Sequence, residues 1–100
     1  MKKDELCIRD WSKFNAVVPQ SYRSLLLALA NKATPYDERS PDTSQIVYIG
    51  PVAKAIMAEC GWKTRDPLAK GLKSLCECNA LRREARGVYR VNPDIVVRYR

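Results

Sequence analysis

The residues best suited to chemistry lie between positions 63 and 90, and nearly all of them are cationic. Arginine offers a planar fork of N–H donors and lysine a compact ammonium group, and both pair with phosphate oxygens. Threonine adds a neutral hydroxyl that donates or accepts a hydrogen bond. The candidate contact residues are Lys63, Thr64, Arg65, Lys70, Lys73, Arg82, Arg83, Arg86 and Arg90.

The positive charge of the chain is concentrated in its last forty residues. The net charge is +7 over 100 residues. Residues 1–60 hold eight Lys and Arg against seven Asp and Glu, whereas residues 61–100 hold ten against four. A basic half of this kind suits a polyanion, of which nucleic acid is the first choice. An anionic membrane fits less well, because no basic amphipathic segment with a bulky apolar face is present.

The sequence offers little for catalysis or metal binding. It contains no histidine, which is the commonest general base and a frequent metal ligand. No Gly-rich phosphate loop or nucleophile motif is found. Cys76-Glu77-Cys78 is a C-x-C, not the C-x-x-C of zinc knuckles, so we interpret the cysteines as reduced, partly buried thiols. We therefore expect neither enzyme activity nor a cofactor or metal.

Two helices and a strand are predicted before the basic region. Residues 19–32 have apolar residues at helical spacing on more than one side, with Pro19 at the start and Ser21 as a candidate cap. The loop 34–44 follows, and the β-branched and aromatic stretch 45–50 predicts a short strand. Residues 51–60 predict a second helix that ends at Gly61.

The third predicted helix carries the first group of candidate residues. Asp66 suits the N-cap and Pro67 the first helical position, and the helix extends to about Asn79. At roughly 100° per residue, its leucines cluster on one face with Gly71 beside them, where another helix could approach closely. Lys70 and Lys73 lie on the opposite face. The turn before this helix contributes Lys63, Thr64 and Arg65.

A β-hairpin over residues 80–92 carries the four arginines. Arg86-Gly87 supplies the turn, because glycine tolerates positive φ. Side chains alternate between the two faces of a strand, so we expect Arg82 and Arg90 to lie on faces different from that of Arg83. Tyr89 and Val91 are predicted to hold the hairpin to the core, and we expect Arg83 and Arg86 to be the strongest contacts.

The two ends of the chain are predicted to pack against this body. Residues 1–14 are interpreted as a strand or extended arm, suitable for pairing with a second copy, with Trp11 and Phe14 docking on the body. Residues 94–100 form either a short helix or a strand that packs back. Together the elements predict one α+β domain over residues 1–100. It is a winged helix-turn-helix with three helices, a small antiparallel sheet, a turn and recognition helix at 62–79, and a wing at 80–92.

The C-terminal half also resembles a known family. The stretch WKTRDPLAKGLKSLCECNALRREARGVYRVNPD is similar to the C-terminal half of RepL-type replication proteins of small Gram-positive plasmids and related phages. The similarity extends to SYRSLLLALANKA and QIVYIG, and so covers residues 20–95. Pro67 and Gly71 depart from the family pattern, where larger or β-branched residues are usual. The matching residues are Leu72, Leu75, Ala80, Leu81, Arg82, Arg83, Gly87, Tyr89, Val91, Asn92 and Pro93.

The resemblance implies sequence-specific binding of double-stranded DNA at an origin, or control of replication. A transcription regulator or an accessory protein of a conjugative relaxosome remains an alternative. From another class, a protein–protein docking module or an inhibitor that binds an acidic surface without DNA is also open. Double-stranded DNA is the expected partner, a homodimer and replication or conjugation proteins are open alternatives, and a membrane is not expected. The absence of an apolar leader predicts a cytoplasmic location.

Overall fold

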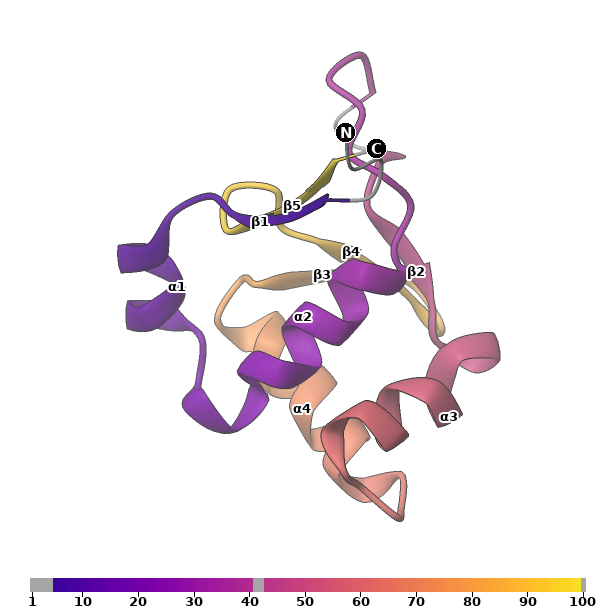
Figure 1. Cartoon of the computed structure of the whole chain (residues 1–100). Helices are drawn as coiled ribbons and strands as arrows, with labels where there is room; N and C mark the ends of the chain where they lie inside the picture. The colour runs from indigo at the N-terminus through magenta and orange to yellow at the C-terminus, as the bar shows by residue number, and fades with distance from the viewer. Residues whose placement is uncertain (1–4, 41–42, 100) are drawn as a thin grey trace.

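The computed structural model describes residues 5–40 and 43–99, and their main chain forms helices and small antiparallel sheets (Figure 1). The predicted α+β class is confirmed. Residues 1–4 of the predicted N-terminal arm lie outside the described residues.

The N-terminal segment is partly strand and partly helix. The strand β1 (Glu5–Ile8) confirms the extended part of the prediction, but residues 11–14 belong to a helix, α1 (Trp11–Val17). The helix forms because the Asp10 side chain accepts a hydrogen bond from the backbone N–H of Lys13 at 3.0 Å. Phe14 docks in the core as predicted, whereas Trp11 is 62% exposed, so its predicted docking is wrong.

The helix α2 (Arg23–Lys32) lies at the centre of the core. A 3₁₀ turn, η1 (Gln20–Tyr22), precedes it, so the predicted helix over 19–32 is confirmed in place but begins with this tighter turn. Ser21 lies within the turn and is not the cap. Leu25, Leu26 and Leu29 are fully buried, and α2 contacts both sheets and the two helices that follow.

The middle of the chain follows the predicted order. The strand β2 (Ile46–Tyr48) leads directly into α3 (Ile49–Cys60), which ends at Gly61 as predicted. The helix α4 (Asp66–Glu77) follows the turn. Asp66 is its first residue and Arg65 takes the N-cap position without a side-chain hydrogen bond, so the predicted Asp66 cap is wrong by one residue. With α1, the described residues contain four α-helices in place of the three expected.

Gly71 lets α4 lie close against α2. A Cβ placed on Gly71 would overlap the Cδ2 of Leu25 and would come within 2.9 Å of Cδ1 of Tyr22. No carbon atoms pack that closely, so only glycine permits this approach. Trp62, half-buried after the end of α3, adds an edge-to-face contact with Tyr22 at 6.4 Å between ring centroids and so packs as an anchor between the helices.

The hairpin supplies the central strand and one edge strand of a three-stranded sheet. β3 (Leu81–Ala85) and β4 (Val88–Val91) flank the turn, and the strand order is β2-β4-β3. Gly87 has φ of 72°, which confirms the predicted positive φ in the turn. The backbone oxygen of Gly87 accepts a hydrogen bond from the Ile49 N–H at 2.9 Å, which ties the hairpin tip to the start of α3.

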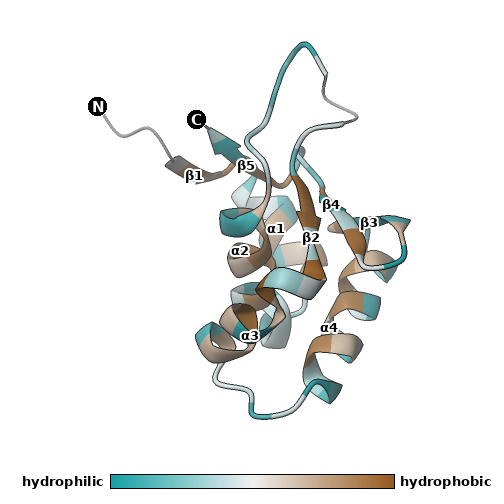
Figure 2. Cartoon of the chain, turned by 90° about the vertical axis from the view of Figure 1, so that its right-hand side faces the viewer, coloured by the Kyte–Doolittle hydropathy of each residue, from teal (hydrophilic) through white to brown (hydrophobic). Residues whose placement is uncertain are grey.

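The C-terminal segment is a strand, which decides between the two alternatives left by the sequence. β5 (Val96–Tyr99) pairs with β1 in a separate two-stranded antiparallel sheet. The strand β1, which lies in the predicted N-terminal arm, is therefore paired with a strand of the same chain. Figure 2 shows the turn between α3 and α4 at one end of the molecule, opposite the loop between α2 and β2.

Gln45 joins the two sheets through a set of buried hydrogen bonds. Its side-chain Nε2 donates to the carbonyl oxygens of Val91 and Val96, both at 3.0 Å, and its Oε1 accepts from the N–H of Arg98 at 2.7 Å. Its own carbonyl accepts from the N–H of Val91 at 3.0 Å. Gln45 is 1% exposed and has φ of 57°, so it is a core residue with an unusual main chain. From the sequence, Gln45 was expected only as the first residue of the strand over 45–50.

Candidate nucleic-acid interface

The helix α4 has one buried face and one exposed cationic face. Leucines and Gly71 occupy the buried face, as the helical spacing predicted. Lys70 and Lys73 are exposed on the other side, with the small Ala69 beside them and acidic residues only near the two ends of the helix. An α-helix with an exposed cationic face of this kind can approach a polyanion closely.

The turn before α4 adds three more exposed candidates. Lys63, Thr64 and Arg65 all lie on the surface, between the end of α3 and the first turn of α4. The carbonyl of Arg65 accepts from the N–H of Ala69 at 2.9 Å, so its main chain is fixed by the helix while its side chain remains exposed. Asp66 follows at once and is also exposed. Its carboxylate is favourable at a helix N-terminus but opposes an anion placed there.

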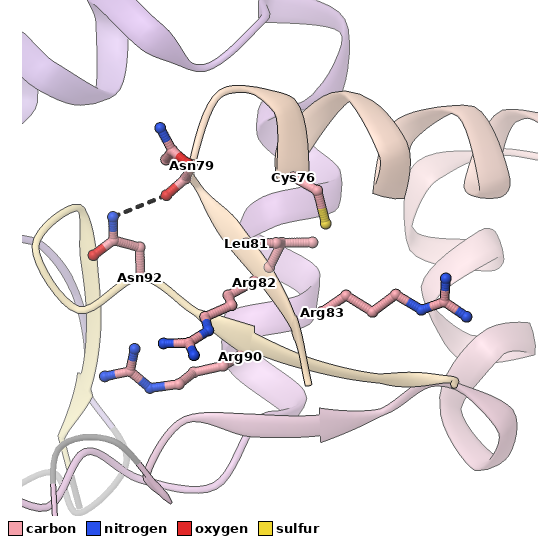
Figure 3. Close-up of a pocket in the computed structure, with 7 residues that line it drawn as sticks. All are labelled: Cys76, Asn79, Leu81, Arg82, Arg83, Arg90 and Asn92. Atoms are coloured by element: carbon pink, nitrogen blue, oxygen red, sulfur yellow. Dashed lines mark hydrogen bonds between the residues drawn. The ribbon is translucent and has the colours of Figure 1, made fainter. Parts of the chain in front are cut away.

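The hairpin divides its arginines between two faces (Figure 3). Arg82 lies opposite Arg90 and Arg83 opposite Tyr89 in the register of β3 and β4. Arg82 and Arg90 point to the same side in Figure 3, while Arg83 points away from them. The predicted separation of Arg83 from the other two is confirmed. Arg86 is exposed in the turn and belongs to neither face.

Arg83 shares a groove with α4. A hollow of about 380 Å³ is lined by Ala69, Leu72, Lys73, Cys76, Arg83 and Tyr89. Lys73 from the helix and Arg83 from β3 are therefore the two cations of one groove. Tyr89 lines the groove and is half-buried. It also packs against the core, in agreement with its predicted anchoring role.

Arg82 and Arg90 line a second hollow, of about 390 Å³, where the end of α4 meets the sheet, and Cys76 and Arg83 line this hollow as well as the first. Asn79 and Asn92 line it as well, and Figure 3 shows the hydrogen bond that joins them above the two arginines. Arg82 makes a 3.5 Å ion pair with Glu84 and keeps 72% of its side chain exposed. Such an exposed pair contributes little to stability.

The two asparagines are placed by the end of α4. Asn79 has φ of 64°, and the helix ends with hydrogen bonds from the N–H of Asn79 to the Cys76 carbonyl and from that of Ala80 to the Leu75 carbonyl. This is the left-handed helix ending that asparagine tolerates. Asn92 then donates from Nδ2 to the carbonyl of Asn79 at 2.9 Å. Neither asparagine was among the residues predicted from the sequence, although an asparagine at a helix end is a recognisable signal.

The cysteines near the hairpin have the character of structural thiols. Burial raises the pKa of Cys76, the neighbouring Cys78 raises it further, and Arg83 opposes both effects. Burial, with a smaller effect from Glu59, also raises the pKa of Cys60. Among the described residues, no cluster of three or more Cys, Asp or Glu side chains could hold a metal ion. In the same part of the chain, no helix is both long and apolar enough to cross a membrane.

One comparison with known proteins finds a relationship. Residues 52–100 match the family model described as Firmicute plasmid replication protein (RepL). The match covers just under half of the chain and includes most of α3, all of α4, the hairpin and β5. The RepL-type relationship predicted from the sequence is confirmed for this part of the chain. No curated protein and no solved structure shows a significant match.

All the predicted contact residues lie within the matched part of the chain. The structure brings Lys73 and Arg83 together in one groove, with Lys70 exposed on the same face of α4, and places Arg82 and Arg90 around a second hollow that Arg83 also lines. Not every cation there is free for binding: Arg98 is half-buried and donates from Nη1 to the Ala33 carbonyl. The surface charge available to a polyanion is thus smaller than the sequence total suggests.

Proposed function

We propose that this protein is a winged-helix domain that binds double-stranded DNA through α4 and the hairpin. The observation that carries the proposal is the exposed face of Lys70 and Lys73, which continues across a groove to Arg83. The order of a helix, a turn, a second helix and a hairpin on a three-stranded sheet supports it. The buried faces of both elements hold this cationic surface in a fixed shape.

In this proposal α4 lies in the major groove. Lys63 and Arg65 approach the phosphates from the turn, together with the hydroxyl of Thr64, while Lys70 and Lys73 lie along the helix. Arg86 at the tip of the hairpin contacts the backbone beside the groove. Pairing of these cations with phosphates provides most of the affinity and makes it dependent on salt. Base contacts from the exposed face of α4 would supply specificity.

The proposed role is replication of a plasmid or a phage, at an origin or in its control. The match of residues 52–100 to the RepL family supports this role, because the matched residues include all of α4 and the hairpin. A transcription regulator or a relaxosome accessory protein would use the same surface. Pairing as a homodimer and contact with replication proteins remain predictions. A docking module that binds an acidic protein is the alternative from another class.

A pair of charge reversals on α4 tests the proposal. Lys70→Glu with Lys73→Glu replaces two exposed cations by anions, so we expect at least a hundredfold loss of affinity for duplex DNA, since each lost contact and each new repulsion costs on the order of 1 kcal/mol. The measurement is fluorescence anisotropy with a labelled duplex. Circular dichroism should show an unchanged fold, because both side chains are exposed.

The matched control reverses two exposed cations elsewhere. Lys13→Glu with Arg39→Glu produces the same change of net charge on α1 and on the loop before β2. We expect it to weaken duplex binding only by the general charge effect, about tenfold or less. Equal losses in the two double variants would show that overall charge, and not α4, determines binding. Normal binding by the α4 variant would overturn the proposed interface.

A further inference from the structure

The two-stranded sheet of β1 and β5 has one closed edge and one open edge. On the far side of β5, the N–H of Arg98 donates to Oε1 of Gln45 at 2.7 Å, and the carbonyl of Arg98 accepts from the N–H of Tyr36 at 2.8 Å. On the far side of β1, no main-chain hydrogen bond forms among residues 5–40 and 43–99. Such an open strand edge is a template for one further strand.

Leu6 and Ile8 direct their main-chain groups to this open edge. In an antiparallel pair, residues that hydrogen-bond to the partner strand alternate with residues whose N–H and C=O groups point away from it. Arg9 donates its N–H to the Ile95 carbonyl at 2.8 Å. By alternation Cys7 also faces β5, whereas Leu6 and Ile8 face away from it. The N–H and C=O groups of these two residues are therefore the ones that a further strand would engage.

A partly apolar hollow adjoins the open edge. It measures about 420 Å³ and is lined by Leu6 of β1, by the α2 residues Ser24, Leu27, Ala28 and Asn31, and by Glu59 of α3. Leu6 belongs both to the edge and to the hollow, and its side chain is only half-buried. A strand added to β1 would therefore cover apolar surface in addition to forming main-chain hydrogen bonds.

The sequence of β1 is complementary to a second copy of itself. When two β1 strands pair antiparallel about Cys7, Leu6 of each copy lies opposite Ile8 of the other. The same register sets Glu5 of each copy opposite Arg9 of the other. Opposite charges at directly opposed positions stabilise a sheet, and like charges destabilise it. Registers centred on Leu6 or on Ile8 would break both charge pairs.

We propose that the outer edge of β1 is a homodimer interface, where two copies form one continuous antiparallel sheet in the order β5-β1-β1-β5. The occupant is a second copy because a single register satisfies the main-chain, apolar and charged positions of β1 together. Figures 1 and 2 show β1 and α4 on different sides of α2, so the pairing leaves α4 of each copy uncovered. The dimer does not depend on the proposed function, since neither α4 nor the hairpin takes part.

Reciprocal charge changes test the register. Glu5→Arg places arginine at both opposed positions, and Arg9→Glu places glutamate at both. A strand pair this short buries less than a standard interface, so we expect the unmodified chain to dimerise at roughly 0.1–1 mM in sedimentation equilibrium. Each single variant should dimerise about tenfold more weakly or worse. An equimolar mixture of the two variants should recover the dimer, because every opposed pair then again joins arginine to glutamate.

Lys54→Glu is the matched control. It makes the same charge change as Arg9→Glu at an exposed position on α3, so it should dimerise like the unmodified chain. Circular dichroism checks that each variant is folded. A chain that stays monomeric at about 1 mM would overturn the proposal and leave the edge to a strand of another protein. Single variants that dimerise as well as the unmodified chain would also overturn it.

Duplex binding separates this proposal from the proposed function. Below roughly 10 µM the chain is monomeric, so changes at Glu5 and Arg9 should leave duplex affinity measured there unchanged. Loss of the dimer with intact duplex binding would overturn the β1 interface alone. Dimerisation of a chain that binds no duplex would leave the interface in place and overturn the proposed function.

Oxidation gives an independent check of the register. Cys7 is exposed and falls opposite itself in the dimer, in a non-hydrogen-bonded pair. Cα atoms in such a pair are about 4.5 Å apart, which a disulfide can span. Diamide takes two electrons and two protons from two thiols, so it should join two chains through Cys7, as mass spectrometry of tryptic peptides would show. Arg9→Glu should slow this cross-link about tenfold. Cross-links through the other cysteines alone would overturn the register.

Discussion

The core around Gln45 and the surface around α4 use polar groups in opposite ways. Gln45 is 1% exposed, and its side chain makes three hydrogen bonds to the main chain of the two sheets. Lys70 and Lys73 are exposed and project from a helix whose other face is buried. Polar groups in the first region hold the fold together, while those in the second are available to a ligand. Changes in the first should therefore cost stability, and changes in the second should cost binding.

The largest expected effect is a loss of stability at Gln45. Gln45→Met keeps the length of the side chain but removes every hydrogen-bonding group. It leaves the carbonyls of Val91 and Val96 and the N–H of Arg98 buried without this partner. We expect a loss of about 3 kcal/mol or more in the free energy of unfolding, measured by urea denaturation.

The same variant also tests the division between the two regions. The fraction of Gln45→Met that remains folded should bind duplex DNA with unchanged affinity. A variant that is fully folded and stable yet does not bind would show that the sheet junction contributes directly to the interface.

The next effect concerns the contact between α2 and α4. Gly71→Val places a branched side chain against Leu25 and Tyr22, where even a Cβ does not fit. We expect a loss of about 2 kcal/mol in unfolding free energy, since overpacking of a core costs roughly 1–3 kcal/mol. The matched control is Gly50→Val in α3, whose Cβ meets no atom within 4 Å, and it should change stability little. Equal losses would refute the close approach of the helices.

A smaller effect, on binding alone, is expected at Arg83. Arg83→Gln removes the cation that faces Lys73 across the groove, so duplex affinity should fall about tenfold in anisotropy measurements, while the unfolding free energy stays within about 0.5 kcal/mol. Arg9→Gln, an equal charge change at an exposed position next to β1, is the control. If both variants bind equally well, the groove has no part in DNA binding.

The smallest effect is chemical and involves Cys76. Because burial raises its pKa, fewer Cys76 thiols are ionised at pH 8, and iodoacetamide should modify Cys76 several-fold more slowly than the exposed Cys7. The raised pKa also means that the folded state holds this proton more tightly. Its contribution to stability is present at neutral pH and is lost as the pH rises through the raised pKa. Faster modification of Cys76 would contradict its burial.

The sequence predicted those parts of the fold that local patterns determine. Alternation in the hairpin separated Arg83 from Arg82 and Arg90, and the leucine spacing of α4 identified its exposed lysines. Gly71 was expected to allow a close helix contact, and the contact with α2 confirms it. These features depend on residues near each other in the chain, whose periodicity carries the information.

The features that the sequence did not predict depend on distant contacts. A glutamine at this position in the sequence is typical of the surface. Gln45 is buried only because β4 and the start of β5 both hydrogen-bond to its side chain. The helix α1 has only seven residues and depends on its cap at Asp10 and on burial of Phe14. Asn79 and Asn92 meet only because the hairpin returns β4 to the end of α4. Such long-range pairings leave no periodic signal in the sequence.

The most direct test of the central claim is the binding of the unmodified protein to a random-sequence duplex at increasing salt, followed by fluorescence anisotropy. If α4 and the hairpin bind the phosphate backbone through about five cations, the logarithm of the binding constant should fall linearly with the logarithm of salt concentration, with a slope of about −4 to −5. An absence of binding at low salt, or binding that does not weaken with salt, would contradict the account.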